Sequence, residues 1–111
     1  INMSKIDRVA ASHILIMHKE SQDSRSNISK EEAEKKIKNI LKNIKEKKTT
    51  FADAAALNSD CSSSSTGGSL GEFGRGMMVK AFEDVAFSLK VSEVSEPFES
   101  EFGFHIVKRD S

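Results

Sequence analysis

Hydrophobic residues along this 111-residue chain follow two patterns, one typical of strands and one typical of helices. Residues 8–17 form an apolar, partly β-branched run of strand length. Near the other end of the chain, residues 93–98 and 104–109 have the same character. We expect the first and last of these strands to lie in one mainly antiparallel sheet flanked by helices, because strands from distant parts of a chain can pair as neighbours.

Three stretches between the outer strands carry apolar residues at helical spacing. The first begins with a capping box at Ser29 and predicts a helix over 30–47. Residues 51–57 predict a short helix with Thr50 as its N-cap, and residues 80–89 predict a third helix. The order strand, helix, helix, loop, helix, strand, strand indicates an α+β fold.

The remaining segments are polar or rich in small residues. Residues 59–76 are rich in Ser and Gly and predict a long loop, which in a small domain is uncommon unless it is functional. The polar stretch 19–27 predicts a second loop. At this length the chain fits one domain, which we assign to residues 8–111 with an N-terminal tail at 1–7.

Charge and composition narrow the range of partners. Lys plus Arg and Asp plus Glu both number 17, so no positive excess favours nucleic acid or an anionic membrane. The apolar runs are far shorter than the roughly 20 residues that span a bilayer, and no secretory signal is visible. The lone Cys61 cannot form an internal disulfide and suits a reducing compartment. We therefore expect a monomer in the cytoplasm, the nucleus or both, without nucleic-acid or membrane partners.

Three residues could carry chemistry. His13 lies in the first predicted strand, Cys61 opens the Ser/Gly loop and His105 lies in the last strand. Leu15 shares the face of His13, because a strand alternates its faces with period two. The simplest interpretation is that each is a buried core residue, since Cys above all is often buried.

Two kinds of site remain as alternatives from these residues alone. A metal site could use His13, Cys61, His105 and Asp60, but none of the spacings typical of paired metal ligands is present, so we predict no metal. A Cys–His hydrolase would use the same thiol as a nucleophile, although no recognisable nucleophile turn accompanies it.

Four stretches of the chain are specific when they occur together in this order. They are Ala-Ser-His-Ile-Leu-Ile at 11–16, the segment 51–62 that ends in Ser-Asp-Cys-Ser, the Gly-rich segment 67–87, and Gly-Phe-His-Ile-Val at 103–107. In this combination the chain resembles the parvulin family of peptidyl-prolyl isomerases over nearly its whole length. The resemblance implies a parvulin/FKBP-like fold, a four-stranded antiparallel sheet surrounded by helices.

The resemblance also implies an activity, the cis–trans isomerisation of X-Pro bonds in proline-containing protein substrates, without a cofactor. It assigns catalytic roles to His13, Cys61 and His105, with the two imidazoles side by side beneath a shallow groove. A pocket for the substrate proline would be lined by Leu70, Met78 and Phe82. Without the resemblance, the simplest interpretation of Met77, Met78 and Phe82 is that they are core residues. Supporting positions are Leu15, Ser100 and Phe102.

One branch of the family prefers phosphoserine or phosphothreonine before proline. The Cys at position 61, where some parvulins carry Asp, resembles that branch. The chain departs from the branch at Met17, where a Lys is usual, and in the loop that follows, which is short. In that loop Lys19 and Arg25 could contact a phosphate, whereas its acidic residues would repel one. Phe102 stands where the branch has Ser. A non-catalytic module that binds proline-containing segments in the same groove remains the alternative.

Overall fold

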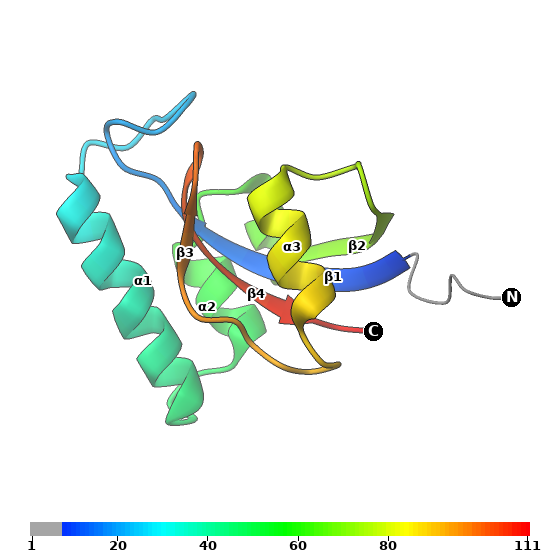
Figure 1. Cartoon of the computed structure of the whole chain (residues 1–111). Helices are drawn as coiled ribbons and strands as arrows, with labels where there is room; N and C mark the ends of the chain where they lie inside the picture. Colours follow the sequence, from blue (N-terminus) through cyan, green and yellow to red (C-terminus); the bar gives the residue numbers. More distant parts are fainter. Residues whose placement is uncertain (1–7) are drawn as a thin grey trace, which may run out of the picture.

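The computed structural model of the protein describes residues 8–111 and is built on a four-stranded sheet in the order β2-β1-β4-β3 (Figure 1). All neighbouring strands run antiparallel. The strands are β1 (Arg8–Ile16), β2 (Ser69–Gly74), β3 (Phe98–Ser100) and β4 (Gly103–Arg109). The predicted sheet is confirmed, with the first and last strands as its central pair. The expected tail at residues 1–7 lies outside the described residues.

Three helices match the predicted ones closely: α1 (Lys30–Lys45), α2 (Phe51–Asn58) and α3 (Lys80–Ser88). The capping box is present, since the Ser29 hydroxyl accepts from the Glu32 N–H and the Ser29 N–H donates to the Glu32 carboxylate, both at 3.1 Å. The Thr50 hydroxyl caps α2 in the same way. Within the described residues, no helix is both long and apolar enough to cross a membrane.

The two faces of the sheet are covered by different helices, as Figure 1 shows with α3 in front and α2 behind. In β1, Ile14 and Ile16 pack against α1 and α2, whereas Val9 and Ala11 pack on the α3 side. Because strand faces alternate, His13 falls on the α3 side as well. The core is therefore split into two layers, and the candidate catalytic residue His13 lies in the layer beneath α3.

The predicted strand at 93–98 is wrong in its position. Only Val94 forms an isolated bridge, with Lys108, and the strand itself begins at Phe98. Two features of the segment explain the shift. Ser92 has a positive φ of 73°, which breaks an extended run, and Pro97 has no N–H to give to a ladder.

The predicted loop at 59–76 holds structure that the pattern did not indicate. Ser62–Thr66 form a 3₁₀ helix, and Ser69–Gly74 form the edge strand β2. Between them, Gly68 has φ +86°, and an added Cβ there would lie 2.5 Å from the carbonyl oxygen of His13. Glycine is therefore required where this turn approaches the backbone of His13.

Candidate active site

Two imidazoles meet on the α3 face of the central strand pair. In the register of β1 and β4, His13 lies opposite Val107 and Leu15 lies opposite His105, so the two histidines are diagonal neighbours on one face. Their Nδ1 atoms are 3.3 Å apart and their rings are nearly parallel, at 24°. One of the two Nδ1 atoms therefore donates a hydrogen bond to the other.

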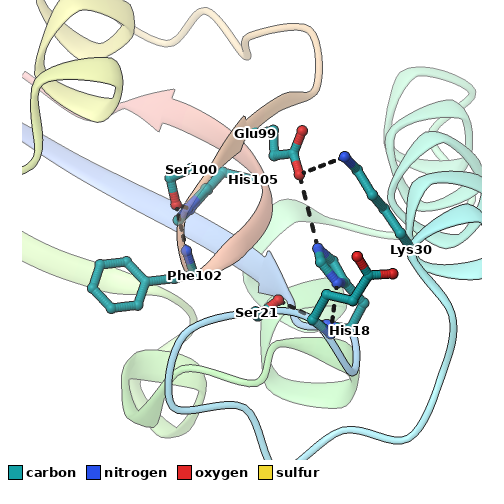
Figure 2. A network of polar contacts seen from close by, with 8 residues as sticks. His18, Ser21, Lys30, Glu99, Ser100, Phe102 and His105 are labelled. Atoms are coloured by element: carbon teal, nitrogen blue, oxygen red, sulfur yellow. Dashed lines mark hydrogen bonds and ion pairs between the residues drawn. The ribbon is translucent and has the colours of Figure 1, made fainter.

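A serine extends this contact on the other side of His105. Ser100 Oγ lies 2.7 Å from His105 Nε2 and also accepts the Phe102 N–H at 3.1 Å (Figure 2). In the described residues His13 Nε2 is buried and has no hydrogen-bond partner. The three hydrogen-bonded side chains Ser100, His105 and His13 thus have two neutral tautomeric arrangements. One leaves a free N–H at His13 Nε2, and the other leaves a free acceptor there.

Burial keeps both imidazoles neutral. Desolvation lowers the pKa of His13 from 6.5 to about 4. Desolvation, reinforced by repulsion from His13, lowers the pKa of His105 to about 3. The lowered pKa values make both imidazoles weak bases, which disfavours an imidazolium–thiolate pair of the kind that activates a hydrolytic cysteine.

Aromatic rings cause this desolvation. Phe82 of α3 meets both imidazoles edge-on, with its centroid 5.4 Å from that of His13 and 5.8 Å from that of His105. Phe98 of β3 stacks on His105 at 5.2 Å and 13°. Phe82 is only 3% exposed and also packs on Phe73, so it belongs to the core as well as to the site.

Cys61 is brought to the site by polar contacts at the end of β1. The Asp60 N–H donates to the Leu15 carbonyl at 2.7 Å, and the Asp60 carboxylate accepts the Met17 N–H at 2.8 Å. The Ser59 hydroxyl accepts the Leu15 N–H at 3.0 Å. These bonds fix the segment before the half-buried Cys61. In the part of the chain that the structure describes, no hydrogen bond joins its thiol to either imidazole.

A cavity of about 270 Å³ collects these groups. Its lining is mostly apolar and consists of His13, Cys61, Leu70, Met77, Met78, Val79, Phe82, Phe102 and His105. A larger cavity of about 350 Å³ lies between α1 and Pro97, but it is lined by lysine, glutamate and aliphatic residues and has no nucleophile or imidazole. The smaller cavity is therefore the candidate active site. Among residues 8–111, no group of three His, Cys, Asp or Glu side chains is arranged to hold a metal ion.

Comparisons with known proteins agree on one family. The family described as "Rotamase: PPIC-type PPIASE domain" matches residues 13–111. The peptidyl-prolyl cis-trans isomerase Pin1 of Arabidopsis thaliana is 39% identical over 117 residues, which cover 96% of this chain and 98% of the relative. This chain belongs to the parvulin family of peptidyl-prolyl isomerases.

Longer parvulins contain the same domain. The isomerase ESS1 of Saccharomyces cerevisiae is 44% identical over 110 residues, covering 92% of this chain and 65% of the relative. The solved structure of ESS1 from Candida albicans superposes with a TM-score of 0.93 at 32% identity, covering 99% of this chain and 66% of that chain. The chain thus spans about two thirds of the length of these two relatives. As a member of the family, it has peptidyl-prolyl isomerase activity.

The residues expected to matter in a parvulin fall into three groups here. All the residues assigned to catalysis or to the proline pocket line the cavity, and so does Phe102. Leu15 and Ser100 lie next to it, as the cross-strand neighbour and the hydrogen-bond partner of His105. Lys19 and Arg25 lie outside it, exposed in the loop 17–29, where the Arg25 guanidinium donates to the Asp60 carbonyl at 3.3 Å.

Sequence reasoning missed two features of this parvulin site. Val79 lines the cavity, although the sequence pattern gave it no role, and so does Met77, whose default interpretation as a core residue is wrong because its side chain is largely exposed. On the opposite face of β3, the Glu99 carboxylate lies 3.2 Å from Lys30 Nζ and 3.9 Å from His18 Nε2 (Figure 2). Alternation along β3 could have placed Glu99 opposite Ser100, but its partners become neighbours only in the folded chain.

Proposed function

We propose that this parvulin domain rotates Ser-Pro and Thr-Pro bonds, phosphorylated or not, and that His13, Cys61 and His105 are its catalytic residues. One observation carries the proposal. Two neutral imidazoles and a thiol converge in a single cavity whose other walls are apolar. We further propose that Leu70, Met78 and Phe82 hold the pyrrolidine ring there.

The reaction requires no bond to break. Rotation about an amide faces a barrier of about 18–20 kcal/mol because the C–N bond has partial double-bond character. In the twisted state conjugation is lost and the carbonyl is less polar than in either planar form. A cavity that holds the ring and excludes water favours that state, and each ~1.4 kcal/mol of preference gives a tenfold rate.

Cys61 acts in this scheme as a polar neighbour of the carbonyl rather than as a nucleophile. Two observations support this role: both imidazoles are uncharged at neutral pH, and within residues 8–111 neither is hydrogen-bonded to the thiol. The hydrogen bonds from Ser100 through His105 couple the tautomer of His13 to the direction of the Ser100 hydroxyl bond, so the group presented at His13 Nε2 is either a donor or an acceptor.

The residue before proline would face the loop 17–29. Its two cations, Lys19 and Arg25, can donate hydrogen bonds to an anionic group there. Glu20 and Asp23 in the same loop weaken this attraction. We therefore propose a modest preference for phosphoserine or glutamate over serine at that position. The domain would act as a monomer in the cytoplasm or the nucleus, where a reducing environment keeps the thiol of Cys61 free.

Exchange spectroscopy by NMR tests both parts of the proposal without a coupling protease. Peptides that contain Ser-Pro, phosphoSer-Pro or Glu-Pro should all exchange faster with the enzyme, and the anionic pair should have the lower KM. Lys19→Ala should reduce that preference, whereas Lys36→Ala, an exposed lysine on α1, should not. Binding without accelerated exchange would instead identify a proline-binding module, and equal KM values would reject the anionic preference.

A further inference from the structure

Met77 is the one residue lining the cavity that the fold leaves largely exposed. Three large hydrophobic side chains are exposed within residues 8–111, and of these only Met77, at 62%, lines the cavity. Its sulfur accepts the Gly74 N–H at 3.2 Å. This bond holds the thioether at the cavity rim, where an incoming side chain can cover it.

Met77 lies at the end of the sheet opposite the loop 17–29. Since Arg8 pairs with Gly74, the turn that carries Met77 leaves the sheet beside the start of β1. The loop 17–29 leaves at the far end of β1, and Figure 1 shows these two segments on opposite sides of α3. His13, near the middle, therefore has the charged loop 17–29 on one side and, on the other, a turn whose cavity-lining residues Met77, Met78 and Val79 are apolar.

The loop 17–29 is also joined to the turn that carries Phe102. The Gln22 N–H donates to the Glu101 carbonyl at 2.8 Å, next to Phe102. Figure 2 shows the Phe102 ring pointing away from the ion pairs of Glu99. The charged loop thus lies next to the turn that brings Phe102 to the cavity, whereas Met77 comes from the turn at the other end of β1.

The cavity has room for more than a proline ring. A water molecule in the liquid occupies about 30 Å³, so the cavity of about 270 Å³ has the volume of about nine waters, more than one five-membered ring fills. The remaining space, next to an exposed apolar rim, suits part of a neighbouring side chain.

Resting on the proposed function, in which the loop 17–29 receives the residue before proline, we propose that Met77 contacts the residue after proline and selects an apolar side chain there. The substrate class is then Ser/Thr-Pro followed by an aliphatic or aromatic residue. About 40 Å² of apolar surface removed from water on binding corresponds to about fivefold in KM.

Two peptides that differ only after proline, Ser-Pro-Leu and Ser-Pro-Asn, test this by exchange spectroscopy. The unchanged protein should show about fivefold lower KM for the Leu peptide, with similar kcat for both. Met77→Gln should bring the ratio of the two KM values to about one. The amide oxygen of the new side chain can still accept the Gly74 N–H, so the turn is kept. Met77→Leu should preserve the fivefold ratio.

Leu57→Gln is the matched control, because Leu57 is 85% exposed on α2 and does not line the cavity. It should leave the fivefold ratio intact. A ratio near one in the unchanged protein, or an equal loss of the ratio in both glutamine variants, overturns the inference and leaves the isomerase assignment standing. Absence of catalysed exchange with both peptides overturns the proposed function, and the inference with it.

Discussion

Lowering the pH from 7 to 5 should destabilise this domain through its two buried histidines. In the unfolded chain both imidazoles titrate near pH 6.5, whereas burial lowers the pKa of His13 to about 4 and that of His105 to about 3. Between pH 6.5 and the two lowered pKa values, the unfolded chain binds up to about two more protons than the folded chain. Their contribution to stability is therefore complete above pH 6.5 and is lost as the pH falls toward the folded pKa values.

The size of the effect follows from the same pKa values. Each histidine accounts for about 2 kcal/mol between pH 7 and pH 5, so the pair should remove about 4 kcal/mol. That is a large share of the roughly 5–15 kcal/mol by which a domain is stable. Urea unfolding at pH 7, 6 and 5, extrapolated to water, measures it directly.

NMR titration of the imidazoles in the folded protein provides an independent check. His13 and His105 should remain neutral down to about pH 5. A loss of stability below about 1 kcal/mol between pH 7 and 5, or folded titration midpoints near 6.5, would refute the assignment of these rings as desolvated and neutral.

Four substitutions test the site further. Cys61→Asp should keep substantial isomerase activity, and complete loss with an intact fold would favour a nucleophilic thiol. Ser100→Ala should cost about 1–2 kcal/mol of stability and shift the His105 Nε2 resonance, because a 2.7 Å bond is lost. Phe82→Ala should cost about 3–5 kcal/mol in urea unfolding and raise KM in the remaining folded fraction. Gly68→Ala should cost more than about 2 kcal/mol, because its Cβ meets the His13 carbonyl; an unchanged urea midpoint contradicts this.

Local sequence signals predicted the helices and the central strands well. The capping box at Ser29 and the cap at Thr50 act within one turn of backbone, so they can be recognised without knowing the fold. The run at 8–16 is buried along most of its length and therefore stands out as apolar. By contrast, β2 exposes half of its residues and contains Gly71, so neither alternation nor propensity marks it as a strand.

The site itself was only partly predictable, for a different reason. Period-two alternation places His13 on one face, but its pairing with His105 depends on the register between strands from opposite chain ends. The lowered pKa values depend in addition on Phe82 and Phe98, which arrive from α3 and β3. From sequence, Met77 is interpreted by default as a core residue, because an apolar pair favours burial and its exposure beside the cavity is a property that only the folded chain has.

The strands and the turns around the cavity hold different parts of the proposed site. His13 and His105 are held by the paired central strands β1 and β4, with Gly68 on one side and Ser100 on the other. The residues proposed to choose the substrate lie in turns beyond the strand ends, where substitutions disturb fewer buried contacts. If this separation holds, changes at Met77 or in the loop 17–29 alter KM and selectivity, whereas changes that move the two imidazoles lower kcat for every peptide.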